Sequence, residues 1–317
     1  MKILVTGSAG FIGFHLTKKL IELKHNVTGI DNLNNYYDKS LKISRLKSLE
    51  NMEYTFHELD INNINVLDDD FDLVIHLAAQ AGVRSSVSMI KEYKRSNIEG
   101  HEAVLNFCVS RKIKKFIFAS SSSVYGSKDK NIFSEKEKKL KPSSYYGETK
   151  RINEQFSELI ASTKDISILG LRFFSVYGPF GRPDMAYFLF ANALKENKEV
   201  TLNNRGQMLR DMTYIDDIIH GIVKSINYIS NNNVVFEVFN LGNNNPIMTI
   251  DLLEAIEKNL GIKAKINHRE TQNEDKMTNA DLTKSKKLLG YNPKTNFSDG
   301  LNFFLKWHSD YMKNEKN

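Results

Sequence analysis

Tyr146 and Lys150 are the residues whose types and spacing could do acid–base chemistry, and both lie in the segment PSSYYGETKR, residues 142–151. Residues four positions apart share one face of a helix. A lysine charge and a helix N-terminus both favour the phenolate, so we expect the pKa of Tyr146 to be lowered toward neutrality, as a general base requires. The alternative is two ordinary residues on a helix surface, because a chain with 13 tyrosines and many lysines contains such a pair by chance. The elements that surround the pair must therefore decide between these two interpretations.

A glycine turn, GSAGFIG at residues 7–13, joins the predicted strand KILVT to a segment with helical periodicity. Gly7 permits a tight turn, Gly10 lets the backbone approach a pyrophosphate at the helix N-terminus, and Gly13 permits close helix–strand packing. Asp31 ends the next strand, where a carboxylate can bind both hydroxyls of an adenosine ribose and repel a 2′-phosphate. We therefore expect NAD rather than NADP. The alternatives are a glycine turn that only packs the helix and a turn-forming Asp31.

Four hydroxyl residues, Ser120 to Ser123, follow the strand pattern KKFIFA. Ligands of an open parallel sheet bind beyond the carboxyl ends of its strands. These serines are therefore expected to face the cofactor, close to the helix that begins near Tyr146.

Strand patterns alternate with helical patterns through the first part of the chain, and DLVIHLA is almost continuously apolar, as in a strand covered on both faces. This predicts an α/β fold, a Rossmann-type doubly wound parallel sheet with a smaller C-terminal α/β domain. We place the NAD-binding domain at residues 1–175, with a returning segment near 212–243. The smaller domain, at 176–317, is expected to bind the substrate.

Composition excludes several classes of protein. The chain has 317 residues, 41% of them hydrophobic, which indicates a folded protein with a sizeable core. Its net charge of +6 is spread among interspersed acids, so we expect a solvated surface and no nucleic-acid partner. A single cysteine, Cys108, excludes an intrachain disulfide, and the eight histidines show no metal-ligand spacing. Without a leader pattern or a long apolar run, a cytoplasmic protein with no membrane partner is expected.

Five motifs together resemble one family over the whole chain: the glycine turn, DLVIHLAAQ, SSSSVYG, YYGETK and RDMTYIDDI. In this order they are similar to the extended short-chain dehydrogenases/reductases, the family of nucleotide-sugar epimerases and dehydratases. The resemblance implies that Tyr146 is the base, that Lys150 orders the nicotinamide ribose, and that Ser121, or its neighbour Ser122, hydrogen-bonds the reacting hydroxyl. Further cofactor contacts implied by the resemblance are Phe11, Ile12, Asn32, Asp60, Ile61, Leu77, Ala78, Ala79, Gln80, Asn97 and Ser120.

The resemblance also bears on the reaction. Dehydratases and decarboxylases of this family carry an acidic residue just before Val-Tyr-Gly, where this chain has Ser122 and Ser123. Simple 4-epimerisation is therefore implied: Tyr146 takes the O4 proton, C4 gives hydride to NAD, and the 4-keto sugar turns over before hydride returns. NAD is regenerated in each cycle and is expected to stay tightly bound.

The segments DNLNNYYDKSLKISRL and RFFSVYGPFGRPDMA resemble the UDP-glucuronate 4-epimerases of this family. The resemblance implies that Ser175 and Arg182 bind the sugar carboxylate, and a guanidinium suits a carboxylate because it can form two parallel hydrogen bonds. It further implies substrate contacts from Arg84, from Arg210 to the diphosphate and from Asp275 to the uridine ribose. A UDP-glucose or UDP-N-acetylglucosamine 4-epimerase stays open as an alternative, as do a UDP-glucuronate decarboxylase and a non-catalytic dinucleotide-binding protein.

Relatives in the family pair two helices across a dimer interface, which implies a homodimer for this chain. The matching segments, near 97–111 and 146–162, carry the apolar residues Val104, Phe107, Phe156 and Ile160. These residues could equally belong to the core of the domain. The resemblance to UDP-sugar epimerases also implies a role in polysaccharide biosynthesis, as the supplier of a uronic-acid precursor.

Overall fold

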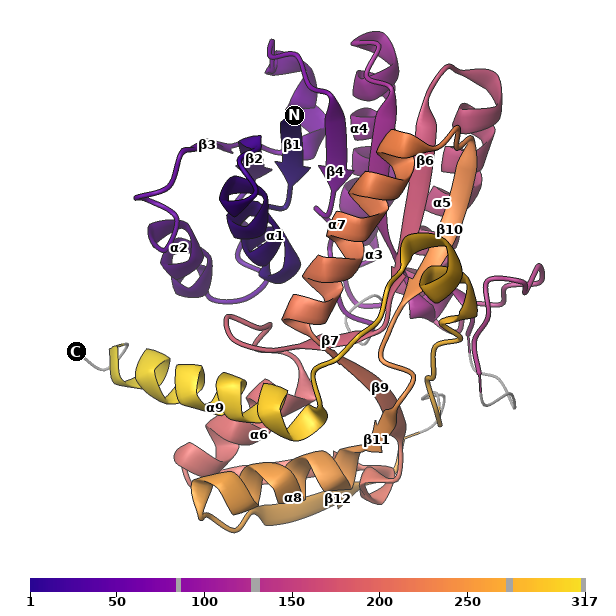
Figure 1. Cartoon of the computed structure of the whole chain (residues 1–317). Helices are drawn as coiled ribbons and strands as arrows, with labels where there is room; N and C mark the ends of the chain where they lie inside the picture. Colours follow the sequence, from indigo (N-terminus) through magenta and orange to yellow (C-terminus); the bar gives the residue numbers. More distant parts are fainter. Residues whose placement is uncertain (84–86, 127–131, 272–275, 315–317) are drawn as a thin grey trace.

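The computed structural model describes residues 1–83, 87–126, 132–271 and 276–314, and a large parallel sheet organises this part of the chain (Figure 1). Its seven strands are hydrogen-bonded in the order β10-β6-β5-β4-β1-β2-β3, and every neighbouring pair is parallel. The strands are β1 (Lys2–Thr6), β2 (Asn26–Asp31), β3 (Tyr54–Glu58), β4 (Leu73–His76), β5 (Lys115–Ser121), β6 (Ser167–Phe173) and β10 (Phe236–Leu241). The predicted Rossmann-type α/β fold is confirmed.

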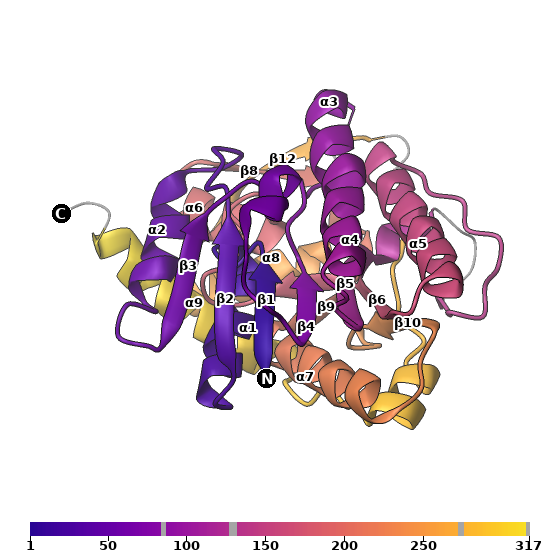
Figure 2. The ribbon, with the colours of Figure 1, turned by 90° about the horizontal axis from the view of Figure 1, so that it is seen from above.

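Helices cover both faces of this sheet (Figure 2). On one face lie α4 (Gly100–Ser110) and α5 (Tyr145–Thr163), and on the other lie α1 (Phe11–Glu22) and α7 (Ile215–Asn231). Side chains of a strand alternate between the faces, so Ile3 and Val5 of β1 join one apolar core and Leu4 joins the other. Within the described ranges, no helix is both long enough and apolar enough to cross a membrane.

Two elements that follow residue 175 in the chain return to the large sheet. Strand β10 pairs with β6 along its whole length, and α7 packs on β5 and β6. Both elements lie within the segment near 212–243 that the sequence pattern places as returning. The carboxyl edge of the sheet faces the remaining elements, which lie between β6 and α7 and after β10 in the chain (Figure 1).

Those elements form a smaller lobe, drawn below the large sheet in Figure 1. A three-stranded sheet has the order β11-β9-β7, and a two-stranded parallel sheet joins β12 to β8. The bounds are β7 (Ser175–Tyr177), α6 (Ala186–Lys195), β8 (Glu199–Asn203), β9 (Leu209–Tyr214), β11 (Pro246–Met248), α8 (Thr249–Leu260), β12 (Lys265–Arg269) and α9 (Phe297–Asn314). The other helical segments are α2 (Lys39–Lys47), α3 (Ile90–Tyr93), 3-10 turns at Ile61–Val66, Ser122–Val124 and Asn204–Gly206, and π-helical turns at Lys94–Glu99 and Ser285–Leu289.

The apolar residues of α4 and α5 differ in how far they are exposed. Val104 and Phe107 are fully buried in the core beneath α4, so they are not available to a partner subunit. Phe156 and Ile160 are partly buried against the same core. The sequence pattern could not separate these pairs, because an apolar face turned toward the sheet and one turned toward another subunit have the same spacing.

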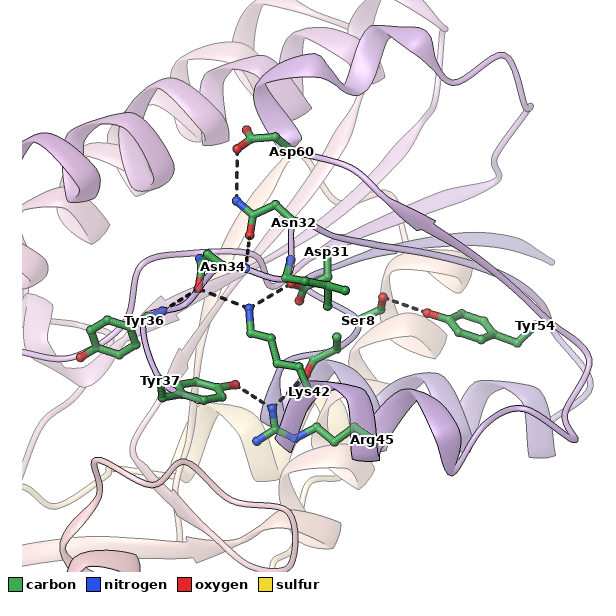
Figure 3. Close-up of polar contacts among 12 residues, drawn as sticks. Ser8, Asp31, Asn32, Asn34, Tyr36, Tyr37, Lys42, Arg45, Tyr54 and Asp60 are labelled. Atoms are coloured by element: carbon green, nitrogen blue, oxygen red, sulfur yellow. Dashed lines mark hydrogen bonds and ion pairs between the residues drawn. The ribbon is translucent and has the colours of Figure 1, made fainter. Parts of the chain in front are cut away.

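Arg45, on α2, connects the two lobes from a completely buried position. Its Nη1 donates to the carbonyl oxygen of Ala9 at 2.9 Å and to the Tyr37 hydroxyl at 2.6 Å, and the latter contact is drawn in Figure 3. Nε and Nη2 donate to the carbonyl oxygen of Phe180, at 3.1 and 2.7 Å, and Nη2 also reaches that of Gly181 at 3.2 Å. One side chain thus fixes the loop after β7 against the glycine turn.

Replacing this arginine is expected to destabilise the chain strongly. Arg45→Met keeps the apolar stem but leaves several buried carbonyl oxygens without a donor, each at a cost of about 1–3 kcal/mol, so the free energy of unfolding should fall by at least about 3 kcal/mol. Urea denaturation followed by tryptophan fluorescence measures the change. Arg151→Ala is the matched control, because Arg151 makes a partly exposed ion pair with Glu148 and should matter by less than about 1 kcal/mol. Equal losses in the two variants would contradict the bridging role.

Candidate active site

A cavity of about 330 Å³ lies at the carboxyl edge of the large sheet, between β1, β2, β4 and β5 and the loop that follows β7. It brings together most of the residues that the sequence predicts. Those that line it are Gly7, Gly10, Phe11, Ile12, Gly13, Asp31, Asn32, Asp60, Ile61, Leu77, Ala78, Ala79, Gln80, Ser120, Ser121, Ser122, Tyr146, Lys150, Ser175 and Arg182.

Gly7 and Gly13 of the glycine turn have no room for a side chain. Gly7 has a φ of +71°, and a Cβ there would lie 2.7 Å from the backbone nitrogen of Ala78. A Cβ on Gly13 would lie 2.0 Å from the carbonyl oxygen of Gly7. Gly10 caps α1 without a side-chain hydrogen bond, so the first amides of the helix remain available to an anion at the cavity. These features fit the pyrophosphate of a dinucleotide.

Asp31, at the end of β2, has a buried partner that the sequence analysis missed (Figure 3). Lys42 of α2 places its Nζ 3.1 Å from Oδ1 of Asp31 and 3.3 Å from Oδ1 of Asn34, and both charged side chains are almost fully buried. The backbone N–H of Leu33 also donates to Oδ1 of Asp31, at 2.9 Å. A signal was present in the sequence, because Lys42 and Arg45 share one face of the helical segment LKISRLK.

Cofactor preference is expected to depend on this pair. Asp31→Asn should weaken NAD binding by about tenfold or more, since a hydrogen bond to a charged acceptor contributes about 1.5–3 kcal/mol. NADP binding should improve, because the negative charge is gone and Lys42 is left to attract a phosphate. Titration calorimetry on protein stripped of cofactor measures both dissociation constants. Asp72→Asn is the control, because Asp72 accepts a hydrogen bond from the backbone N–H of Lys2 outside the cavity. An unchanged preference for NAD in Asp31→Asn would contradict this role.

Asp60 follows β3 and is held by several donors at the edge of the cavity. Its Oδ1 caps the 3-10 turn by accepting from the backbone N–H of Asn62 at 2.9 Å, and its Oδ2 accepts from Arg95 at 2.9 Å and Asn32 at 3.1 Å. Burial alone would raise the pKa of Asp60, but these hydrogen bonds outweigh it and lower the pKa to about 2. Asp60 is therefore ionised across the working range and positions Asn32.

Asn97 is among the predicted cofactor contacts, yet it lies behind the cavity wall. Its Oδ1 accepts from the backbone N–H of Gln80 at 2.7 Å, and its Nδ2 donates to the carbonyl oxygen of Gln80 at 3.0 Å and to Thr149 of α5 at 3.1 Å. The residue it positions, Gln80, lines the cavity, and the buried Nε2 of Gln80 has no partner within the described part of the chain. Buried amide donors are nearly always paired, so this group fits a polar ligand.

The predicted acid–base pair, Tyr146 and Lys150, also lines the cavity. Helix α5 begins at Tyr145 because the Ser144 hydroxyl accepts from the backbone N–H of Gly147 at 3.0 Å, which places Tyr146 in its first turn. Lys150 donates to the carbonyl oxygen of Ala119 at 2.9 Å, and its Nζ lies 5.9 Å from the centre of the Tyr146 ring. The expected shared helix face is present.

Ser121 is the serine that contacts the tyrosine. Its side chain acts to lower the pKa of Tyr146, its hydroxyl donates to Oγ of Ser123 at 3.1 Å, and its Oγ accepts from the backbone N–H of Ser123 at 3.1 Å. Ser122 lines the cavity as well, in the 3-10 turn that follows β5. The geometry therefore favours Ser121 over Ser122 as the group next to a reacting hydroxyl.

The expected lowering of the Tyr146 pKa is wrong. Burial raises the pKa of Tyr146, although the positive charge of Arg182 and the hydrogen bond with Ser121 act in the opposite direction. Burial also lowers the pKa of Lys150 to about 8, with the nearby Glu154 opposing that change. The depth of the site explains both shifts, because a low-dielectric environment disfavours the charged form of each group.

Arg182 lines the cavity with Ser175, but its guanidinium already has a carboxylate partner. Its Nε and Nη2 bind Oδ1 and Oδ2 of Asp184 at 3.0 and 2.5 Å. The hydroxyl of Tyr36, from the loop after β2, donates to the same carboxylate at 3.3 Å. A ligand carboxylate would therefore meet a neutral ion pair, with the remaining N–H groups of Arg182 as its donors.

Of the three other predicted substrate contacts, the one with a described position does not line this cavity. Arg210, on β9, is absent from its lining, and its guanidinium donates to the carbonyl oxygen of Leu209 at 3.0 Å. Arg84 and Asp275 lie outside the described residues. Across the described ranges, no cluster of three or more His, Cys, Asp or Glu side chains could hold a metal ion.

Comparison with known proteins gives consistent matches. The model of the NAD dependent epimerase/dehydratase family matches residues 3–242. UDP-glucuronate 4-epimerase 4 of Arabidopsis thaliana is 39% identical over 334 positions, covering 99% of this chain and 76% of that protein. The structure of UDP-glucuronic acid 4-epimerase from Bacillus cereus, in complex with UDP-glucuronic acid and NAD, matches with a TM-score of 0.93 and 37% identity, covering 98% of this chain and all of that one. UDP-glucose 4-epimerase from Thermotoga maritima, with UDP-glucose, matches with a TM-score of 0.88 and 28% identity, at coverages of 98% and 100%. The resemblance found in the sequence is confirmed.

Proposed function

The chain belongs to the NAD-dependent epimerase/dehydratase family, and on that premise we propose that it is a UDP-glucuronate 4-epimerase that interconverts UDP-glucuronate and UDP-galacturonate. One observation carries the proposal. Tyr146, Lys150 and Ser121 line the same cavity as Ser175 and Arg182, so the proposed acid–base group and the proposed carboxylate-binding group would face one ligand. Residues 1–175 with the returning segment would bind NAD, and the smaller lobe would bind the sugar nucleotide.

The chain's own residues would handle the proton and the orientation of the sugar. When bound, NAD supplies a hydride acceptor and donor for C4 of the sugar. Tyr146 would accept the proton of the C4 hydroxyl, which Ser121 holds by a hydrogen bond, and would return a proton at the end of the cycle. The Lys150 ammonium would favour the phenolate form of Tyr146 at the moment of transfer. Ser175 and Arg182 would hold the carboxylate while C4 changes configuration.

The position of the acids supports epimerisation over a second chemical step. Among the described residues, the carboxylates that line the cavity are Asp31, the last residue of β2, and Asp60, which follows β3. Strands β4 and β1 separate them in the sheet from β5, which leads to Ser121. A decarboxylase or dehydratase would require an acid beside the serines, where Ser122 and Ser123 stand.

The Arg182–Asp184 pair favours one second candidate, a 4-epimerase of a neutral UDP-hexose such as UDP-glucose. Because the pair has no net charge, it does not by itself require an acidic ligand.

We also propose a homodimer formed through α4 and α5, where the side chain of Leu159 is exposed.

Proton NMR of the purified protein with UDP-glucuronate and no added NAD tests the proposal. Appearance of the UDP-galacturonate anomeric signal is the expected result, and it would also support a retained cofactor. The same experiment with UDP-glucose and UDP-N-acetylglucosamine is the comparison. Turnover of a neutral sugar nucleotide alone would overturn the uronate assignment, and release of carbon dioxide would identify a decarboxylase.

A further inference from the structure

A buried carboxylate lies on the same face of α5 as the acid–base pair. Glu154 follows Lys150 by one helical turn and Tyr146 by two, and its side chain is almost fully buried. It is not among the residues that line the cavity, and the reaction proposed above gives it no part. Burial of a carboxylate is costly unless it is paired and hydrogen-bonded. The partners of Glu154 therefore indicate its role.

Those partners join the cavity wall to the neighbouring strand. The Ser120 hydroxyl donates to Oε1 of Glu154 at 2.5 Å. Arg172, on β6, grips the carboxylate with two hydrogen bonds, from Nε to Oε1 at 2.8 Å and from Nη2 to Oε2 at 2.7 Å. An ionised carboxylate can only accept hydrogen bonds. The proton of Ser120 is therefore committed to Glu154, and Ser120 presents only lone pairs to the cavity that it lines.

The charge of Glu154 also acts on Lys150. Burial lowers the pKa of Lys150 to about 8, and the negative charge of Glu154 opposes that change. His76 of β4 and His101 of α4 face the same lysine, but burial lowers the pKa of His76 to about 3 and that of His101 well below its usual value. Both histidines are therefore neutral where Lys150 titrates. Among the described residues, the charge that acts on the pKa of Lys150 is that of Glu154, and Arg172 is the ion-pair partner of this carboxylate.

We propose that Glu154 is a positioning residue of the active site, which orients the Ser120 hydroxyl and holds the Lys150 ammonium in its charged form. This inference rests on the proposed function, in which Lys150 must carry its charge when Tyr146 takes a proton. Arg172 is the counter-ion that limits how much of the negative charge Lys150 senses. Glu154 itself touches neither sugar nor cofactor.

Two substitutions in the Glu154–Arg172 ion pair test the proposal, because they should shift the titration midpoint of Lys150 in opposite directions. Glu154→Gln removes the stabilising negative charge, so the titration midpoint of Lys150 should move below pH 8. Arg172→Gln leaves that negative charge unneutralised, so the midpoint should move up. Both variants break the same buried ion pair, and Arg172→Gln also removes a hydrogen bond to the Tyr125 hydroxyl. A merely structural role therefore predicts losses of stability in both variants without opposed shifts of the Lys150 midpoint.

The midpoint can be measured without substrate. Carbon NMR of protein labelled with 13C at the lysine ε position, stripped of cofactor, follows the titration, and Lys150→Arg assigns the signal. In the loaded enzyme, the alkaline limb of the kcat profile should move in the same two directions. Glu154→Asp, which keeps the charge, should restore a midpoint close to that of the wild type.

Midpoints that stay unchanged in both variants, or that move in the same direction, would overturn the proposal. If the single variants fail to fold, Glu154→Gln combined with Arg172→Gln replaces the ion pair by an amide pair. Its Lys150 midpoint should still fall, because the nearer charge is lost, and an unchanged midpoint there would also overturn the proposal. The titration uses no sugar nucleotide, so its outcome is distinguishable from a wrong substrate assignment.

Discussion

Tyr146→Phe is expected to lower kcat for epimerisation by about 10²–10⁴-fold, the range that a positioned acid–base group contributes. Phenylalanine can keep the edge-on packing against Tyr93, whose ring centre lies 6.2 Å from that of Tyr146. It lacks the hydroxyl that hydrogen-bonds Ser121 and that would take the proton. Initial rates from proton NMR of UDP-glucuronate conversion measure the loss.

Tyr145→Phe is the matched control for this substitution. Tyr145 precedes the proposed base in the same helical turn, and it is not among the residues that line the cavity. Its variant should keep the wild-type rate. NAD content, measured after denaturation, should be unchanged in both proteins, which separates lost chemistry from lost cofactor. Full activity of Tyr146→Phe would exclude this tyrosine as the base, and the catalytic assignment would then have to be abandoned.

Arg182→Ala is expected to lower kcat/KM for UDP-glucuronate by about 10²-fold or more, with a much smaller loss for UDP-glucose. Removing one partner of a buried, charged hydrogen-bonded pair costs about 2–5 kcal/mol, and each 1.4 kcal/mol corresponds to a tenfold change in kcat/KM. The pair meant here is the guanidinium of Arg182 with the carboxylate of the bound sugar. Arg182→Lys should lie between wild type and the alanine variant, because lysine keeps the charge but lacks the planar fork. Side-by-side rates with both sugar nucleotides give the ratio.

Asp184→Asn is the companion to this substitution. It removes the internal carboxylate that now occupies the guanidinium, so the preference for the acidic sugar should rise rather than fall. For Arg182→Ala, rates should be taken at several pH values. The positive charge of Arg182 lowers the pKa of Tyr146, so the loss of this arginine would raise that pKa. Equal losses for both sugars in Arg182→Ala would mean that the arginine acts through Tyr146 and not on a carboxylate.

The end of the cavity at the glycine turn could be predicted from the sequence because its parts are local. The turn from Gly7 to Gly13 lies within one strand–turn–helix unit, and Asp31 ends the next strand. In a parallel sheet the carboxyl ends of the strands meet at one edge. That rule also places Ser121 and the start of α5 at the same cavity, without any knowledge of side-chain packing. The positions of these groups thus follow from local segments and from the rule that the carboxyl ends of parallel strands share one edge.

Only the tertiary structure decided how deeply each group is buried and which charge it meets. The pairs Lys42–Asp31, Arg182–Asp184 and Glu154–Arg172 were not foreseen, and the last joins a helix to a strand 18 residues further along. The pKa of Tyr146 has the opposite shift from the one expected, because burial raises it, and the loop after β7 contributes residues to the cavity wall around this tyrosine. The free energy of a charge depends on its solvent exposure and its partner. Both are set by segments that meet only when the chain has folded.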